Sequence, residues 1–247
     1  MRSDPCLPDR ASPLLQFPRR PAKEHCMNGH AFTLAGTDLI ALASGALYWP
    51  AQDMLCVSDL HLGKAARRGR LGQATLPPYE TRDTLARLGA VLGHIAPRTV
   101  VCLGDSFDDP EAARELSDPD AETLRALQNG RRWIWVEGNH DPGPLGPAGE
   151  HMPDLAIGAL RFTHIATPQG SGEISGHYHP KATVRSKGRA MSRPAFLIDA
   201  TRVILPAFGS YTGGLRCSDP VLASLMSPDA IAVLTGARAL CMPMGRA

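Results

Sequence analysis

The sequence predicts an α/β fold with two β-sheets, and three observations support this. Residues 53–57, 99–103 and 132–136 are short apolar stretches of the kind that form buried strands. Segments with helical spacing of apolar residues separate them, as in a sheet covered by crossover helices. After Gly143 helical periodicity fades and strand-like runs follow one another, which predicts a second sheet of antiparallel strands.

The first part of the patterned chain predicts hairpin strands followed by a helix. Residues 31–49 hold three apolar pieces separated by Gly36-Thr37-Asp38 and Ser44-Gly45, which are typical turn sequences. A helix is expected after Pro77-Pro78, because apolar residues then recur at spacings of three and four. Its buried stripe comprises Leu85, Leu88, Val91, Leu92 and Ile95.

A second helix is expected to begin at Ser117, whose side chain would cap the first turn together with Asp120. In the second half, apolar runs bounded by turn residues predict strands. The expected strands are 159–163, 195–199 and 202–205, and a closing hairpin of 231–234 and 238–241.

Composition indicates an ordinary globular protein, with 43% hydrophobic and 20% charged residues among 247 and a net charge of +2. Residues 1–26 are rich in proline and predict a disordered leader or upstream-start extension, so residues 27–247 would form a single domain. The six cysteines form no Cys-x-x-Cys pair, which favours reduced thiols and a cytoplasmic location. No apolar run approaches the roughly 20 residues of a membrane span.

Polar clusters follow the predicted strands at five places and contain five of the nine histidines. Their side chains offer nitrogen and oxygen atoms, which hard or borderline divalent metals bind. The clusters are Asp59-x-His61, Gly104-Asp105-Ser106-Phe107-Asp108, Gly138-Asn139-His140-Asp141, His164, and Gly176-His177-Tyr178-His179.

This ordered set resembles the calcineurin-like metallophosphoesterases, whose blocks read Asp-x-His, Gly-Asp-x-x-Asp, Gly-Asn-His-Asp, His and Gly-His-x-His. The resemblance implies a four-layer α/β/β/α sandwich with two mixed sheets. It also implies a general acid, His140, and Asp108 as an acceptor that orients a nearby imidazole. The implied ligands are Asp59, His61, Asp105 and His179 for one metal, and Asp105, Asn139, His164 and His177 for the other.

The chemistry of phosphate esters suits two such ions. Metals about 3.5 to 4 Å apart bind phosphoryl oxygens and lower the pKa of a shared water. A carboxylate can bridge them through its two oxygens, and Asp105 is the natural candidate. On an extended segment the side chains of His177 and His179 would point the same way, so each could address one ion.

Each cluster alone also has an ordinary explanation. Asp-x-His and Gly-Asp-x-x-Asp occur by chance, and an isolated His164 would more often be a core or surface residue. The order of the five clusters, each after a predicted strand, is therefore the evidence. No role is assigned to His25, His30, His94 or His151, and neither a P-loop nor a serine nucleophile elbow is present.

Two basic stretches follow the first and last clusters without an intervening acid. They could track a phosphodiester backbone, or they could be solvated loop charges. The candidate substrate-binding residues are Lys64, Arg67, Arg68, Arg70, Lys181 and Arg185, with Lys187, Arg189 and Arg193 further along the second stretch.

A narrower resemblance, to the bacterial DNA-ligase-associated metallophosphoesterases, rests on Ser58–Lys64, Leu103–Phe107, Gly176–Pro180 and Leu205–Gly214. Relatives often have His where Asp108 stands. The resemblance implies manganese, single-stranded or damaged DNA as substrate, and association with an ATP-dependent DNA ligase, a helicase and a nuclease-like protein in DNA repair. Iron, zinc and magnesium are the alternative metals.

The leading hypothesis is a DNA endonuclease in which a metal-bridged hydroxide attacks the phosphodiester. A small-molecule phosphomonoesterase or cyclic-nucleotide phosphodiesterase is the second hypothesis. The third is a non-catalytic interaction module on the same fold, which the intact set of ligands argues against.

Overall fold

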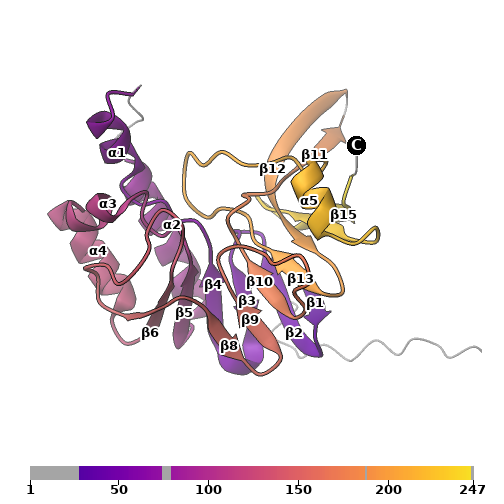
Figure 1. Ribbon diagram of the computed structural model, residues 1–247, viewed down its shortest axis with the longest axis horizontal. Coiled ribbons are helices and arrows are strands. Elements are labelled where there is room, and N and C mark those ends of the chain that lie inside the picture. Colours follow the sequence, from indigo (N-terminus) through magenta and orange to yellow (C-terminus); the bar gives the residue numbers. More distant parts are fainter. Residues whose placement is uncertain (1–27, 74–78, 187, 246–247) are drawn as a thin grey trace, which may run out of the picture.

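The computed structural model describes residues 28–73, 79–186 and 188–245. The leader expected over residues 1–26, Pro77-Pro78 and Lys187 lie outside these ranges. The described chain forms two sheets that pack face to face, with helices on their outer faces (Figure 1). In the part that is described, no helix is long and apolar enough to cross a membrane.

The first sheet contains the strands predicted in the first half of the chain and one further short strand. Strands β1 to β4 are antiparallel neighbours, and β4 to β7 are parallel neighbours. A 3-10 turn, Pro50–Gln52, precedes β4. In sheet order the strands are β1 (Gly29–Leu34), β2 (Thr37–Leu42), β3 (Leu47–Trp49), β4 (Met54–Val57), β5 (Thr99–Leu103), β6 (Arg132–Val136) and β7 (Glu150–Met152).

Both expected helices are confirmed. Leu85, Leu88 and Leu92 of the first are almost wholly buried, and such burial contributes about 1.5 to 3 kcal/mol per side chain. At the start of the second, Ser117 accepts a hydrogen bond from the backbone N–H of Asp120. These helices are α2 (Glu80–Ile95) and α4 (Asp118–Gln128), and two shorter ones are α1 (Lys64–Arg70) and α3 (Pro110–Arg114).

Helix α1 occupies the first basic stretch, where loop charges were one of the two interpretations. Gly63 precedes it in the left-handed conformation, with φ of 79°. The backbone N–H of Gly63 donates to Thr81 Oγ1 and that of Ala65 to Glu80 Oε1, each at 2.9 Å. The acceptors that cap the start of α1 belong to α2, which lies further along the chain. The sequence next to α1 therefore contains no residue that would have predicted where this helix begins.

The second sheet differs from the antiparallel sheet that was predicted. Its strand β10 runs parallel to both β9 and β13, because long connections separate these strands in the chain. The closing hairpin of β14 and β15 is confirmed. In sheet order the strands are β15 (Leu240–Pro243), β14 (Ile231–Leu234), β12 (Arg189–Ile198), β13 (Arg202–Ile204), β10 (Glu173–Ser175), β9 (Leu160–Phe162) and β8 (Leu155–Ile157).

Besides the short strands β7, β8 and β10, two longer elements of the second half were not predicted. Strand β11 (Lys181–Ser186) pairs with the first part of β12 in a hairpin. Its alternation is weak, because only the small Ala182 and the partly buried Val184 mark the core face. Helix α5 (Pro220–Leu225) is too short to show periodicity, and Asp219 caps it by accepting from the N–H of Val221.

Three apolar clusters separate the layers. The central cluster lies between the sheets and includes Leu103, Ile134, Phe162 and Phe196. A second packs the first sheet against α2 and α4, and a third packs the second sheet against α5. This arrangement confirms the expected four layers. In Figure 1, α1 and the β11–β12 hairpin project from the same end of the molecule.

Candidate metal centre

The predicted ligands meet in space, although their loops follow five different strands. Atoms of each group lie within 4.8 Å of one another. The groups are Asp59, His61 and His179; His61, Asp108 and His140; and Asp105, His164 and His177.

In the first group, an imidazole contacts a fixed carboxylate. His179 Nε2 lies 3.1 Å from Asp59 Oδ1 and 3.3 Å from His61 Nε2. Ser58 Oγ donates to Asp59 Oδ2 at 2.5 Å, and the backbone N–H of His177 donates to the same oxygen at 3.0 Å. The Asp59 carboxylate is therefore held by two neighbours while it faces His179.

In the third group, to which Asn139 can be added, three oxygen and nitrogen atoms lie close to His164 Nε2. They are Asn139 Oδ1 at 3.0 Å, His177 Nδ1 at 3.2 Å and Asp105 Oδ2 at 3.4 Å. These atoms act mainly as hydrogen-bond acceptors, and few protons are available to link them to one another. A cation placed among them would relieve the repulsion between their lone pairs.

Asp105 belongs to the third group and also faces His61 of the first. Its Oδ2 is 3.4 Å from His164 Nε2 and 3.9 Å from His61 Nε2, while its Oδ1 accepts from the backbone N–H of His140 at 2.9 Å. Burial acts to raise the pKa of this carboxyl, but hydrogen bonding to His164 and the nearby histidine charges outweigh it and lower the pKa to about 2.

Burial and charge together fit two divalent cations. Asp59 is 0% exposed and Asp105 2%, and buried carboxylates are costly unless cations compensate them. Burial and the charge of His164 lower the pKa of His177, which favours the neutral imidazole that binds metal. The donors are nitrogen and oxygen without sulfur, as hard or borderline metals require.

The backbone of the centre is strained. Asp59, His61, Asp105, His177 and His179 have φ between 45° and 70°, in the left-handed region that side chains rarely adopt. Each such residue costs on the order of 1 kcal/mol and persists only where its surroundings hold it. The expectation of an extended segment at His177 and His179 is therefore wrong, although the two imidazoles do face different groups.

Two glycines of the clusters allow this close packing. A Cβ at Gly176 would lie 1.7 Å from Ser58 Oγ, and one at Gly104 would lie 2.2 Å from His164 Nδ1. Gly104 also has φ of 72°. No larger residue fits at either position without moving the centre.

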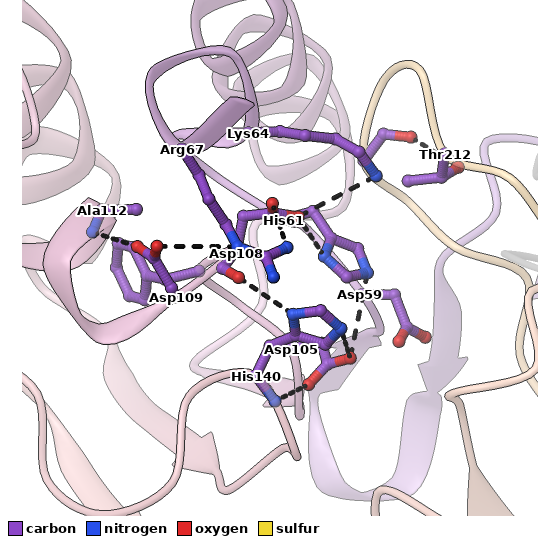
Figure 2. A network of polar contacts seen from close by, with 12 residues as sticks. Asp59, His61, Lys64, Arg67, Asp105, Asp108, Asp109, Ala112, His140 and Thr212 are labelled. Atoms are coloured by element: carbon purple, nitrogen blue, oxygen red, sulfur yellow. Dashed lines mark hydrogen bonds and ion pairs between the residues drawn. The ribbon is translucent and has the colours of Figure 1, made fainter. Parts of the chain in front are cut away.

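His140 is fixed at one nitrogen and accessible at the other (Figure 2). Its Nδ1 lies 2.9 Å from the backbone oxygen of Asp108, and a carbonyl oxygen only accepts, so Nδ1 carries a proton. Its Nε2 lies 4.0 Å from Asp105 Oδ2, and the side chain is 31% exposed. Nε2 is thus the atom that can exchange a proton at the centre.

Asp108 contacts His61 and Arg67 (Figure 2). Its Oδ1 lies 2.9 Å from His61 Nδ1, and its Oδ2 accepts from Arg67 Nη1 at 3.1 Å. Burial acts to raise the Asp108 pKa, but the bonds from His61 and Arg67 lower it to about 2. The ionised carboxylate keeps the His61 proton on Nδ1 and leaves Nε2 directed at the centre.

Asp141 supports the centre in a way that the sequence did not reveal. Its buried carboxylate accepts from the backbone N–H groups of Ser106 at 2.7 Å, Phe107 at 3.1 Å and Gly138 at 3.0 Å. Burial raises its pKa to about 6 despite these donors. Asp141 thereby ties together the loops that carry Asp105 and Asn139. Its place beside His140 was visible, but backbone partners cannot be inferred from residue types.

Acids contact Lys64, Arg67 and Arg70 on α1, but no ion pair to Arg68 is seen among the described residues. Arg70 donates to both carboxylate oxygens of Asp109 at 2.7 Å and to Glu115 at 2.5 Å. Lys64 Nζ lies 3.9 Å from Asp108 Oδ1, and Arg67 pairs with the same carboxylate. Arg68 is half-buried, and its Nε has no hydrogen-bond partner among the described residues.

The second basic stretch lies on the β11–β12 hairpin. Lys181 Nζ donates to the backbone oxygen of Thr212 at 3.1 Å. Arg185 is exposed, and within the described ranges no acid lies close enough to form an ion pair with it. The two stretches therefore differ in how much of their charge is already neutralised.

Among solved structures, the crystal structure of Pseudomonas putida nuclease MPE is similar to this chain. It covers 87% of this chain and 100% of that chain, with 29% identity and a TM-score of 0.67. A Streptococcus pneumoniae TIGR4 protein, described as a conserved uncharacterized protein and predicted phosphoesterase, matches at 12% identity over 77% of this chain and 96% of that one. Its TM-score of 0.30 is too low to bear on this chain. No curated protein matches the chain.

The family model described as calcineurin-like phosphoesterase matches residues 54–190, which is more than half of the chain. This range contains every predicted metal ligand as well as His140. The two mixed sheets have the metallophosphoesterase fold. The chain therefore belongs to the calcineurin-like phosphoesterases and is a metal-dependent phosphoesterase.

Proposed function

We propose that the chain is a dinuclear-metal-dependent phosphodiesterase that cleaves DNA, with single-stranded or damaged DNA as its substrate. The nucleic-acid part of the proposal is supported by the likeness to nuclease MPE over 87% of the chain. The phosphodiesterase part is supported by the convergence of ligands beside one accessible imidazole.

The observation that carries the proposal is the placement of His140. The backbone oxygen of Asp108 holds its Nδ1, and its Nε2 faces Asp105 from the solvent side. A protonated imidazole that faces the centre can give its Nε2 proton to an oxygen within hydrogen-bond reach. His140 is therefore suited to act as the general acid.

Two divalent ions, when bound, would hold the phosphoryl oxygens and lower the pKa of a water molecule. Two sets of side chains would hold the two ions, and Asp105 would belong to both sets. The first set is Asp59, His61, Asp105 and His179, and the second is Asp105, Asn139, His164 and His177.

Hydrolysis forms a bond from a water oxygen to phosphorus and breaks the bond to the leaving oxygen. A sugar oxygen is a poor leaving group, so it needs a proton as that bond breaks. His140 Nε2 would supply the proton, while the carbonyl of Asp108 stabilises the ring through Nδ1.

We extend the proposal to manganese as the metal, to a role in DNA repair and to a cytoplasmic location. Its partners would be an ATP-dependent DNA ligase, a helicase and a nuclease-like protein. This part rests on the resemblance carried by Ser58–Lys64 and Leu205–Gly214. Metal analysis of protein purified without added metal is the first check of it.

The test is cleavage of labelled single-stranded, duplex and circular DNA by the purified protein with and without manganese. We expect metal-dependent cleavage of single strands, including circles, which have no ends. His140→Ala should lose this activity, and His94→Ala, an exposed histidine on α2, is the matched control. Turnover of small phosphoesters without cleavage of any DNA would overturn the nuclease assignment.

A further inference from the structure

An open cavity of about 450 Å³ lies beside the metal centre. Tyr79, Asp83 and Arg87 line it from the start of α2, and Pro194 lines it from β12. The loop Gly209–Thr212 forms the rest of its wall. This cavity has no part in the ligand set or in the role given to His140.

Two tyrosines of this cavity present their rings to solvent. Tyr79 is 55% exposed and Tyr211 52%, and neither phenol makes a hydrogen bond to any described residue. Tyr48, by contrast, is half-buried and donates to Asp53 at 3.4 Å. Two exposed, unpartnered aromatic rings on one cavity are a typical binding surface for another flat ring.

Tyr211 is also held in an uncommon backbone conformation. Its φ of 57° lies in the left-handed region, which large side chains adopt rarely. Two hydrogen bonds fix the adjacent Thr212. Its Oγ1 donates to Gly209 O at 3.1 Å, and the backbone oxygen of Thr212 accepts from Lys181 Nζ. The exposed ring thus projects from a strained stretch of backbone, as is common at binding sites.

The wall of the cavity carries one charge of each sign. Arg87 donates to Ser210 Oγ at 3.5 Å, and Ser210 Oγ in turn donates to the Asp83 carboxylate. The Arg87 guanidinium also lies 4.8 Å from the centroid of the Phe208 ring. A balanced pair of charges offers a donor and an acceptor to a neutral polar ring, and it does not favour a phosphate.

The same loop is attached to the metal centre. The N–H of Gly209 donates to Asp59 O at 3.0 Å, and that of Phe208 donates to Ser58 O at 2.8 Å. At Gly209 a Cβ would lie 2.2 Å from Leu60 O, and at Gly214 one would lie 2.0 Å from His179 O. The wall of the cavity therefore continues directly into two ligand-bearing loops.

We propose that this cavity is a nucleobase subsite, in which an unpaired base next to the scissile phosphodiester stacks on Tyr211 and Tyr79. The proposal rests on the DNA-cleaving function given above and names the feature that selects single strands. In a duplex both faces of a base are already stacked, so the rings cannot reach them without unstacking. An unpaired base has free faces and fits here irrespective of its identity.

The test compares strands with and without bases. Binding of a fluorescent 15-residue thymidine strand and of an equally long strand of abasic residues is measured by anisotropy in EDTA. Tyr211→Ala and Tyr79→Ala should each weaken binding of the thymidine strand about five- to tenfold. Binding of the abasic strand should change less than twofold. Tyr→Phe variants should bind as the unaltered protein does, because they keep the ring.

Leu240→Ala, which shortens an exposed apolar side chain on β15, is the matched control and should bind both strands normally. The KM for cleavage of the thymidine strand with manganese gives a second readout and should rise by the same factor. Equal losses on both strands, or no loss with either alanine variant, would overturn the subsite. Absence of DNA cleavage by the unaltered protein would overturn the proposed function instead, which separates the two failures.

Discussion

The metal centre and the basic rim around it are built in opposite ways. The centre is buried, its side chains contact one another, and its backbone is strained at Asp59, His61 and Asp105. We call the basic residues of α1 and the β11–β12 hairpin the basic rim: Lys64, Arg67, Arg68, Arg70, Lys181 and Arg185. The rim is regular in backbone and more exposed, and acids already engage several of its charges. In the centre, the side chains contact one another as a metal site requires. In the rim, the positions of neighbouring acids determine which basic side chains remain free to bind a phosphate.

The largest expected effect comes from the residue shared by both halves of the centre. Asp105→Asn removes the charge that faces His61 and His164, so we expect both ions to be lost and turnover to fall on the order of 10³-fold or more. Metal content per chain and kcat for a phosphodiester are the measurements. Asp154→Asn, at a surface ion pair with Arg161, is the control. Unchanged metal content in Asp105→Asn would contradict the shared position.

His140→Ala should separate catalysis from metal binding. We expect a loss of about 10² to 10⁴ in kcat on DNA, because removal of a general acid has effects of this size. Metal content should stay within error of the unaltered protein. With a nitrophenolate leaving group, which needs little protonation, the loss should be much smaller. A similar loss of kcat on both substrates would show that His140 maintains the structure of the site and does not protonate the leaving group.

A fall in pH should weaken metal binding at the centre and leave the charge of the basic rim unchanged. Burial acts to lower the pKa of His164, but its bond to Asp105 and the charges of Asp59 and Asp105 raise it above the ordinary value. Protons therefore compete with metal for this imidazole as pH falls, while Asp105, with a pKa of about 2, stays ionised. We expect metal affinity to drop about tenfold per pH unit below the His164 pKa.

Chelator competition titrations between pH 5.5 and 8 measure this dependence. DNA binding in EDTA is the contrasting measurement, since lysine and arginine do not titrate in that window. A flat metal affinity across the range would show that His164 does not bind metal.

The smallest expected effects distinguish the two parts of the rim. Arg185→Ala should lower the slope of log binding constant against log salt by about 0.7, the value for one phosphate contact of a single strand. Arg70→Ala should leave that slope unchanged, because Asp109 and Glu115 already neutralise its charge. It should instead lower the free energy of unfolding by about 1 kcal/mol or less. The reverse pattern would place the DNA track along α1.

The same contrast explains how far the sequence could predict the structure. The meeting of the clusters could be expected, because several follow parallel strands whose ends lie together. The resemblance to the metallophosphoesterases implied which of their side chains would be ligands. The hairpin of β11 and β12 was not predicted, because Ala182 and Val184 give β11 only a short and weak apolar alternation. The pairing of Arg70 with Asp109 and Glu115, separated by 39 and 45 residues, leaves no local signal either.

Tyr79 and Tyr211 illustrate a third kind of residue. They are 132 positions apart and lie next to no predicted ligand, so nothing in the sequence relates them. Only the fold places both on one cavity, through the loop that Gly209 fixes to Asp59. Leu205–Gly214 was one of the stretches that carried the narrower resemblance, but no role in the site could be inferred for it from the sequence.

The left-handed turns at five of the proposed ligand positions have a consequence for protein engineering. A designer who transfers only the histidine and aspartate side chains to a helical or strand scaffold would start from the wrong backbone torsions. The peptide turns, and the glycines that make room for them, belong to the metal-binding unit as much as its imidazoles do. Grafting this centre therefore requires copying whole loops, together with the strand ends that anchor them.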